Sequence, residues 1–347
     1  MSVLHLILIP LSFVYQIILR LRNYLYDSGI FGVSTFDIPT INVGNLAFGG
    51  TGKTPHTEYL IRLLQNHKRL GFLSRGYKRK TTGYIFADAQ ASPSRIGDEP
   101  FQIVSKFKEV AVAVSENRVL GIPNLLFDAP ETEVVLLDDA YQHRALKPGL
   151  NILLTEQNRL YTKDRLVPSG YLREYAAAAS RADLIVVTKC RPDLSSLEKE
   201  KIEQQLQALP HQKVFFSGIT YGIPQAFGQE IALTPDMGVI AFAGIANTAP
   251  FEEYLQTQFA KVSCKAFPDH HYINEKELQE LIGAFERLEE KNKLLVTTEK
   301  DYQKLLESSF AATIQQYPFY YLPIEVYFLA GNKHNFDDEI LNYVQHN

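Results

Sequence analysis

The stretch from Ile41 to Thr57, INVGNLAFGGTGKTPHT, constrains the fold more than any other part of the chain. A β-prone run over residues 38–43 leads into a glycine-rich turn, and a helical pattern begins near Pro55. Strand, loop and helix in this order are the context of a phosphate-binding loop. In such a loop successive backbone N–H groups point at one anion, and the helix N-terminus adds the positive end of its dipole. The stretch therefore predicts a nucleotide-binding α/β domain.

The side chains of this loop have separate expected roles. The candidates for nucleotide binding are Gly49, Gly50, Thr51, Gly52, Lys53 and Thr54. Lys53 is expected to reach the β- and γ-phosphates, and the Thr54 hydroxyl to bind Mg²⁺. The usual pattern G-x-x-x-x-G-K-[ST] has glycine where this chain has Ala47, so one position departs from it. The alternative is an ordinary glycine-rich turn that begins a structural helix.

Length and composition restrict the class of protein. A chain of 347 residues predicts two domains. With 46% hydrophobic and 21% charged residues the composition is that of a globular protein. A formal net charge of −4 argues against a nucleic-acid partner. The two cysteines, Cys190 and Cys264, are isolated, so they predict neither a metal site nor a disulfide framework.

The N-terminal segment has no formally charged residue between Met1 and Leu19, and it lacks the flanks of a signal peptide. It is also shorter than the run of about 20 apolar residues that a spanning helix needs. On a helical wheel its polar side chains fall within roughly 80° of one another. This stripe consists of His5, Ser12, Gln16, Arg20 and Asn23. The pattern suits a helix that lies in a membrane interface, and a helix packed on the protein core is the alternative.

Strand and helix patterns alternate from residue 38 to residue 209, which predicts a doubly wound α/β sheet of the P-loop NTPase type. The expected strands are 38–43, 70–73, 110–114, 134–137, 152–154 and 184–187. The expected helices are 55–66, 100–106, 117–127 and 195–209.

Beyond this first domain, glycines and prolines interrupt extended residues from 213 to 235, as in a ribbon-like linker. A smaller α/β domain follows, with expected strands at 239–243 and 294–297 and helices at 251–259, 275–290 and 300–306. The predicted organisation is an N-terminal membrane-interface helix (1–30), a P-loop domain (31–215), a linker ribbon (216–236) and a second α/β domain (237–347).

Several carboxylates and basic residues are candidates for chemistry. The apolar strand 134–137 ends in Asp138 and Asp139, and an aspartate at such a place holds Mg²⁺ in P-loop enzymes, with Asp138 the first choice. Asp98 precedes a helix, where it either caps the helix or faces the nucleotide. The basic residues over 67–69 and 75–80 suit a solvated surface, or contact with anionic lipid or a phosphorylated substrate. The histidine pair His270 and His271 has no evident third metal ligand, and such pairs are more often part of hydrogen-bonded structure.

Taken in order, these motifs resemble the tetraacyldisaccharide 4'-kinase family, the lipid A 4'-kinases of Gram-negative bacteria. The motifs are VGNLAFGGTGKTP, LSRGY at 73–77, GDEP at 97–100, LLDDAYQHR at 136–144, LVPSGYLRE at 166–174, AGIAN at 243–247, FPDHH at 267–271 and VTTEKD at 296–301. They extend over nearly the whole chain, and the loop of this family is itself atypical at the position of Ala47. The resemblance implies transfer of the γ-phosphoryl group of ATP, with Mg²⁺, to the 4'-hydroxyl of a tetraacylated glucosamine disaccharide 1-phosphate.

The resemblance also implies roles for single residues. Asp98 would act with His270 to activate the hydroxyl, and Lys53 completes the catalytic set. The candidates for substrate binding within the motifs are Asn45, Ser74, Arg75, Tyr77, His143, Arg173 and Glu174. The implied fold has two α/β/α domains joined by a β-ribbon, and the N-terminal helix would hold the enzyme on the cytoplasmic face of the inner membrane.

Two other functions remain open from the residues alone. A GTPase switch usually carries N/T-K-x-D at a strand end, whereas Thr188–Arg191 has arginine in place of the aspartate and Asp193 comes two positions late. A membrane-bound scaffold would hold a nucleotide without turnover. Hydrolysis of ATP without a substrate would favour the switch, and binding without any turnover would favour the scaffold.

Overall fold

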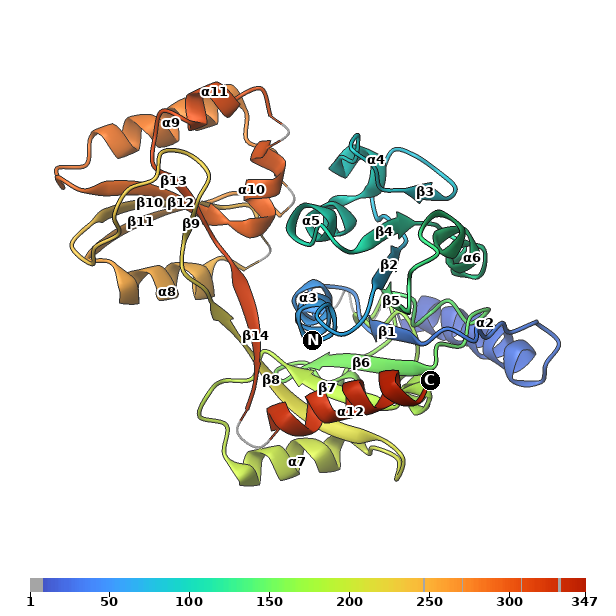
Figure 1. The fold of residues 1–347 in the computed structure, drawn as a ribbon. Coiled ribbons are helices and arrows are strands. Elements are labelled where there is room, and N and C mark those ends of the chain that lie inside the picture. The colour runs from blue at the N-terminus through green and yellow to red at the C-terminus, as the bar shows by residue number, and fades with distance from the viewer. Residues whose placement is uncertain (1–8, 246, 270, 307, 330–331) are drawn as a thin grey trace. The chain divides into compact units, whose positions relative to one another are not determined.

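The computed structural model describes residues 9–245, 247–269, 271–306, 308–329 and 332–347. The chain divides into two compact units, which Figure 1 shows as ribbons. The first unit comprises Met1–Ile219 and Val326–Asn347, and the second comprises Thr220–Glu325. The chain therefore passes between the units twice.

The first unit is built on a nine-stranded sheet with the order β14-β8-β7-β6-β1-β5-β2-β4-β3. The strands are β1 Thr40–Asn45, β2 Leu70–Ser74, β3 Ile85–Phe86, β4 Ala111–Val114, β5 Val134–Asp138, β6 Leu150–Glu156, β7 Leu184–Thr188, β8 Lys213–Tyr221 and β14 Ile324–Phe328. The strands from β8 to β4 in this order pair in parallel, and β3 pairs antiparallel with β4. The central strands are continuous buried runs, as expected where helices cover both faces of a parallel sheet.

Helices cover both faces of this sheet. They are α2 Ile9–Asp27, α3 Lys53–Leu64, α4 Pro93–Ile96, α5 Asp98–Lys106, α6 Arg118–Asp128, α7 Ser196–Leu206 and α12 Asn332–His346, with 3-10 turns at Tyr161–Lys163 and Ala176–Arg181. On one face α3, α5 and α12 share a core with strand residues such as Leu136. On the other face the next residue, Leu137, packs with α6, and α2 and α7 cover neighbouring strands. This arrangement confirms the predicted doubly wound α/β fold.

The second unit is a smaller α/β structure. Its sheet has the order β11-β10-β12-β13-β9, and only β9 runs antiparallel to its neighbour among the described strands. The strands are β9 Gln225–Ala226, β10 Gly238–Ala243, β11 Lys261–Ala266, β12 Lys293–Thr298 and β13 Phe319–Leu322. The helices are α8 Ala249–Gln258, α9 Glu275–Glu286, α10 Glu299–Leu306 and α11 Ala311–Ile314. Apolar side chains of α8 belong to one hydrophobic core cluster of this unit, and those of α9, α10 and α11 belong to another.

The C-terminal segment departs from the expected division, which placed residues 237–347 in one domain. Val326 begins a return to the first unit, where β14 lies beside β8 in the nine-stranded sheet. Helix α12 then buries Phe336, Ile340 and Val344 in the core that it shares with α3 (Figure 1). The reason is long-range packing, because an apolar helix face fits either sheet and its sequence does not select one.

A buried carboxylate joins two helices of the first unit. Glu58 on α3 is 1% exposed and accepts hydrogen bonds from Lys106 Nζ (2.6 Å) and Gln102 Nε2 (2.7 Å) on α5. Arg62 Nη2 donates to the same carboxylate at 2.9 Å. These donors satisfy a charge whose burial would otherwise be costly. Because α3 begins at Lys53 and α5 at Asp98, the contact fixes the relative position of two helices that carry site residues.

We expect the Glu58→Ala variant to lose about 2 kcal/mol of unfolding free energy, because two partly buried cations lose their shared partner. Urea unfolding followed by circular dichroism measures this loss. The matched control is Glu133→Ala, which removes an exposed partner of Lys68 and should cost below about 1 kcal/mol. Equal losses in the two variants would contradict the proposed role of Glu58.

Candidate functional site

The candidate site lies at the edge of the first sheet where parallel strands end. Strands β1, β5 and β2 are neighbours, and their last residues are Asn45, Asp138 and Ser74. The register pairs Val43 with Asp138, which brings the ends of β1 and β5 together. Ligands of doubly wound sheets bind at this edge. The loop that carries Gly49–Thr54 leaves the sheet here.

The loop has a defined conformation before α3. Gly52 is the N-cap residue of α3 with φ 92°, a left-handed conformation that glycine adopts without a steric penalty. Asn45 Nδ2 donates to Thr51 Oγ1 at 2.8 Å, and Thr188 Oγ1 from the end of β7 donates to the Thr51 carbonyl at 2.9 Å. The loop is therefore fixed by side chains from two strand ends.

Lys53 belongs to a charged cluster that unites three sequence motifs. Its Nζ lies 3.5 Å from Asn45 Oδ1 and 3.8 Å from Asp139 Oδ1. Arg173 donates to both Asp139 oxygens, at 2.8 and 2.6 Å, and also to the Asn45 side chain. A bidentate arginine–carboxylate pair of this kind is a strong and directional contact. The cluster sets Lys53 and Arg173 at the mouth of the phosphate loop.

The two neighbouring aspartates titrate in opposite directions. Burial, followed by the negative charge of Asp139, raises the pKa of Asp138 to about 7, although Ser74 Oγ donates to it at 3.1 Å. Burial also acts to raise the pKa of Asp139, but the Arg173 hydrogen bonds and the charge of Lys53 outweigh it and lower this pKa to about 2. Asp139 is therefore ionised at neutral pH, whereas Asp138 is close to half protonated. A cation beside Asp138 would favour its charged form.

The oxygen ligands at this edge fit a magnesium ion that also binds nucleotide phosphates. Asp138 ends β5, and Thr54 lies in the first turn of α3. Over the described part of the chain no group of three or more His, Cys, Asp or Glu side chains forms a metal site. Magnesium typically takes only one or two protein carboxylates and completes its shell with phosphate oxygens and water. Asp139, by contrast, already accepts from Arg173 through both oxygens.

Asp98 is the first residue of α5, and two glycines hold this helix start against the loop after β2. Gly76 has φ 72° and Gly97 has φ 96°. A Cβ atom on Gly97 would lie 3.0 Å from the Gly76 Cα, and one on Gly76 would lie 2.6 Å from the Ile96 carbonyl oxygen. The backbone atoms of the LSRGY and GDEP motifs are therefore in close contact. The negative charge of Glu99 contributes to the raised pKa of Asp138, so the start of α5 faces the end of β5.

Two of the predicted substrate residues in this region, Arg75 and Tyr77, are exposed. His143 is half-buried, and burial, with the charges of Arg118 and Arg75, lowers its pKa to about 4. Its Nε2 atom has no hydrogen-bond partner among the described residues. Because this nitrogen is also buried, the structure does not place it where a substrate would contact it.

Sequence reasoning missed Arg118, which lies beneath the aspartate pair. Arg118 Nη2 donates to the Asp138 carbonyl at 3.3 Å, and Nη1 donates to the Ser115 carbonyl at 3.2 Å. Burial lowers the pKa of Arg118 to about 10, so the side chain remains charged at neutral pH. No local motif marks this arginine, because its contact with β5 joins residues that are distant in the sequence.

Glu174, another predicted substrate residue, is not brought together with the others. Its side chain is fully buried and accepts from Arg181 at 2.8 and 3.0 Å and from Asn23 Nδ2 at 2.7 Å. A carboxylate that is enclosed and paired in this way does not reach a surface that a substrate can contact. Glu174 instead anchors α2 to the first unit.

In the second unit, Asp301 of the VTTEKD motif binds the AGIAN motif directly and the FPDHH motif through Lys304. Its Oδ2 accepts from the Gly244 N–H at 2.8 Å and from Thr298 Oγ1 at 2.7 Å. Lys304 Nζ donates to Asp301 Oδ1 at 2.8 Å and to the His271 carbonyl at 3.1 Å. These contacts hold the FPDHH segment in place.

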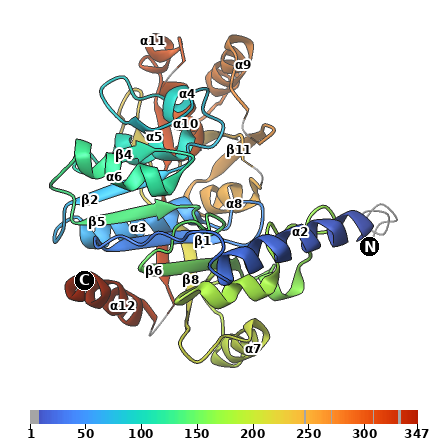
Figure 2. The same cartoon turned by 90° about the vertical axis from the view of Figure 1, so that its right-hand side faces the viewer.

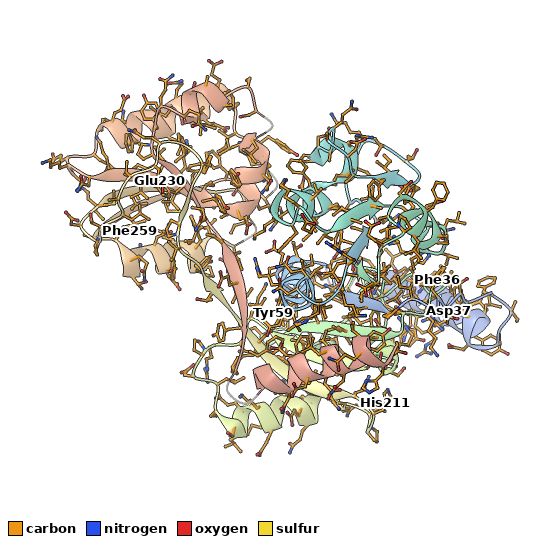
Figure 3. All side chains as sticks on the ribbon, viewed as in Figure 1. Phe36, Asp37, Tyr59, His211, Glu230 and Phe259 are labelled. Carbon is orange, nitrogen blue, oxygen red and sulfur yellow. The ribbon has the colours of Figure 1, made fainter. Side chains whose placement is uncertain are left out.

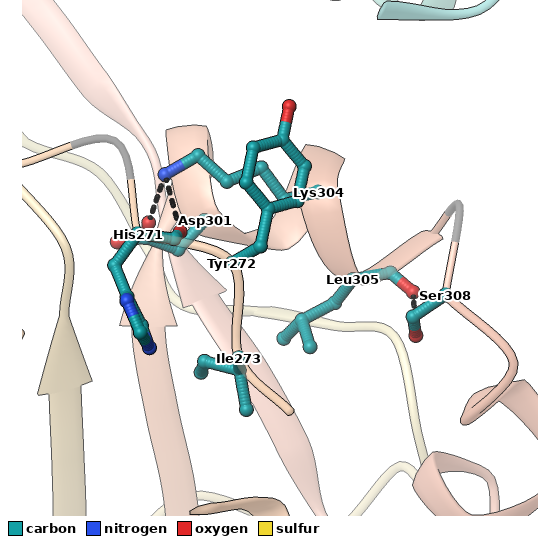
Figure 4. A pocket seen from close by; sticks show the side chains of 7 residues that line it. All are labelled: His271, Tyr272, Ile273, Asp301, Lys304, Leu305 and Ser308. Atoms are coloured by element: carbon teal, nitrogen blue, oxygen red, sulfur yellow. Dashed lines mark hydrogen bonds and ion pairs between the residues drawn. The ribbon is translucent and has the colours of Figure 1, made fainter. Parts of the chain in front are cut away.

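This part of the second unit contains a cavity of about 180 Å³, shown in Figure 4. It is lined by His271, Tyr272, Ile273, Asp301, Lys304, Leu305 and Ser308. His271 Nε2 donates to the Glu277 carboxylate at 2.8 Å and the ring stacks on Phe267, so this histidine has a structural role. The predicted catalytic residue His270 lies outside the described residues.

Two residues of the polar stripe of the N-terminal helix α2, Ser12 and Asn23, face the protein, whereas Arg20 is exposed. Asn23 is 1% exposed and binds Glu174, and Ser12 is buried, where it accepts from the Ser169 N–H at 3.0 Å. Helix α2 is drawn as a ribbon in Figure 2. Its large apolar side chains are between 51% and 64% exposed: Leu11, Phe13, Val14, Ile17, Ile18, Leu21 and Tyr24. His5, the first residue of the stripe, is outside the described ranges. No helix within the described residues has the length and apolar character to cross a bilayer.

Comparison with known proteins gives matches along the whole chain. A family model described as tetraacyldisaccharide-1-P 4'-kinase matches residues 4–345. Tetraacyldisaccharide 4'-kinase of Bacteroides thetaiotaomicron is 40% identical over 358 residues, which cover 99% of this chain and 94% of the relative. The enzyme of that name in Flavobacterium johnsoniae is 41% identical over 351 residues, covering 100% and 99%. The crystal structure of LpxK from Aquifex aeolicus in complex with ATP matches with a TM-score of 0.75 and 30% identity, covering 98% of this chain and 99% of that one.

Proposed function

Because the chain belongs to the tetraacyldisaccharide-1-P 4'-kinase family, we propose that its phosphate loop and the neighbouring strand ends form the phosphoryl-transfer site. The protein is an ATP-dependent kinase that phosphorylates the 4'-hydroxyl of a tetraacyldisaccharide 1-phosphate, a lipid A precursor. The assignment of the site rests on the ion-paired cluster of Lys53, Asp139 and Arg173 beside the loop.

Phosphoryl transfer requires alignment of the reactants and neutralisation of charge more than covalent help. Lys53 neutralises charge on the β- and γ-phosphates, and Asn45 and Asp139 hold its ammonium group at the loop. Asp138 and Thr54 would hold the magnesium ion, which would supply positive charge to neutralise the phosphates. Asp139 orients Lys53 and Arg173 and does not serve as the main metal ligand, because Arg173 engages both of its oxygens.

Asp98 accepts the proton of the sugar hydroxyl, and His270 assists it, as the family resemblance implies. The place of Asp98 at the start of α5, in a segment whose backbone touches the LSRGY loop, supports this role. A positioned general base typically contributes a factor of 10²–10⁴ to the rate. Arg75 and Tyr77 bind polar groups of the disaccharide, since both side chains are exposed.

Purified protein incubated with γ-labelled ATP and tetraacyldisaccharide 1-phosphate tests this function. The expected product carries a new labelled phosphomonoester at the 4'-position of the distal glucosamine, which mass spectrometry and phosphorus NMR identify. Release of the label as inorganic phosphate at the same rate with and without the acceptor would contradict the proposal, because it would indicate a hydrolase.

We propose further that α2 lies in the interface of the inner membrane, on its cytoplasmic face. Seven large apolar side chains of this helix are more than half exposed, which forms a contiguous patch of the kind that marks membrane or protein contact sites. The opposite, polar side is held by Glu174 and the backbone at Leu166 and Ser169. A helix fixed in this orientation presents its apolar face to the acyl-chain region of the membrane, in which the acyl chains of the substrate also lie.

We expect the double variant Ile17→Glu and Ile18→Glu to bind vesicles of mixed zwitterionic and anionic phospholipid at least about tenfold more weakly. The reason is that two exposed side chains lose a burial energy of roughly 1.5–3 kcal/mol each and gain charge. Cosedimentation of the full chain with vesicles measures binding. The control is Phe127→Glu, which adds charge at an exposed apolar residue of α6 and should leave binding unchanged. Equal binding by the double variant and the control would contradict the role of α2.

A further inference from the structure

A buried histidine connects the phosphate loop to the strands that lead between the two units. His56 lies in the first turn of α3 and is 3% exposed. Its Nδ1 lies 2.7 Å from the Gly52 carbonyl oxygen, and its Nε2 lies 2.8 Å from Ser217 Oγ on β8. The ring also meets Phe328 of β14 edge to face, with 6.4 Å between the centroids. The chain passes between the units on these same strands.

The hydrogen-bond partners fix the tautomer of this imidazole. A carbonyl oxygen only accepts, so the proton of the neutral ring is on Nδ1 and is donated to Gly52. Nε2 is then an acceptor, and the Ser217 hydroxyl donates to it.

The two hydrogen atoms donated by His56 hold one peptide of the loop. The Gly52 carbonyl accepts from the His56 N–H at 3.1 Å and from its Nδ1–H at 2.7 Å. A peptide group is planar, with its C=O and N–H directed to opposite sides. The direction of the Gly52 carbonyl therefore sets the direction of the Lys53 N–H. Gly52 has φ 92°, and glycine adopts many backbone conformations at little cost. The orientation of the Gly52–Lys53 peptide therefore needs contacts from outside the loop to fix it.

We propose that His56 is a positioning residue that orients the Lys53 N–H toward the nucleotide phosphates, with Ser217 keeping the ring in the required tautomer. The inference rests on the proposed role of the loop in binding ATP, and it deepens that role. Backbone N–H groups at the start of a helix bind phosphate well only when they converge on it. His56 acts through the Gly52–Lys53 peptide.

Calorimetric titration of the full chain with magnesium and a non-hydrolysable ATP analogue tests this inference. His56→Asn keeps a donor near Nδ1 and loses the contact with Ser217, whereas His56→Gln places its amide near Nε2 and loses the donor to Gly52. We expect His56→Gln to bind the analogue roughly five- to tenfold more weakly, which is the effect of one lost hydrogen bond. His56→Asn should stay within about twofold of the wild type, and Ser217→Ala should fall between the two.

Tyr59→Phe is the matched control on the same helix (Figure 3), since the Tyr59 hydroxyl donates to Asp337 Oδ1 of α12 at 2.7 Å. It should lower the melting temperature without changing the affinity. A merely structural role of His56 would weaken binding by Asn and Gln variants alike, so equal affinities of these two variants would overturn the proposal. Wild-type affinity of His56→Gln and Ser217→Ala would overturn it as well. If Lys53→Ala also kept wild-type affinity, the loop assignment itself would fail.

Discussion

Replacement of Lys53 by alanine is expected to lower the turnover of 4'-phosphorylation by at least about two orders of magnitude. Loss of a single preorganised electrostatic contact to the transition state has an effect of this size. The ammonium group of Lys53 is held by Asn45 and Asp139 in front of the loop, so solvent cannot supply a substitute charge of fixed position. Steady-state rates with saturating ATP and acceptor measure the loss.

Two further variants make this test specific. Thr54→Ala removes the hydroxyl expected on magnesium, and a loss of similar size is expected. Lys68→Ala removes a lysine that pairs with Glu133 on the surface, and its turnover should match that of the wild type. Near-normal turnover of both Lys53→Ala and Thr54→Ala would show that the loop does not bind the transferred phosphate.

Replacement of Asp98 by asparagine is expected to lower kcat by a factor between about 10² and 10⁴, the usual contribution of a general base. Asparagine keeps the size of the side chain at the first residue of α5, but it cannot accept the hydroxyl proton. The affinity for ATP should change little, because the loop around Lys53 provides that binding. Rate measurements combined with direct nucleotide titration separate the two quantities.

The neighbouring carboxylate and the histidine provide the controls for Asp98. Glu99→Gln removes a charge that acts on Asp138 and should change kcat by less than about tenfold. His270→Ala is expected to cost a large factor by itself, and the variant that lacks both Asp98 and His270 should lose little more than the worse single variant. Residues that act as a unit are non-additive in this way. Fully multiplicative losses would show that the two residues have independent roles.

The parts of the site that follow from local structure could be predicted closely. The expected strand 134–137 is β5 Val134–Asp138, and the expected helix 100–106 is α5 Asp98–Lys106. A continuous apolar run forms a buried parallel strand because helices cover both its faces. The glycine-rich loop, in turn, is recognised by its place between a strand and a helix. Both signals are contained in fewer than twenty consecutive residues.

The direction in which α2 faces could not be predicted from its pattern. The wheel separates a polar stripe from a wide apolar face, but it does not tell which of the two meets the protein. Ser12 and Asn23 of the stripe are buried because they have hydrogen-bond partners in the segment from Leu166 to Glu174. Those partners lie more than 150 positions away in the sequence, and their polar groups would be unsatisfied beneath an apolar helix face.

The family and the doubly wound fold could be recognised from the residues alone, because short motifs in a fixed order and alternating strand and helix patterns indicate them. The return of Val326–Asn347 to the first unit, and the pKa values of about 7 and about 2 for the adjacent residues Asp138 and Asp139, depend on contacts in three dimensions. Burial in the sheet and the charges of Lys53 and Arg173, which come from other segments, separate these two carboxylates. Such long-range electrostatic and packing energies depend on positions in space, which spacing along the chain does not encode.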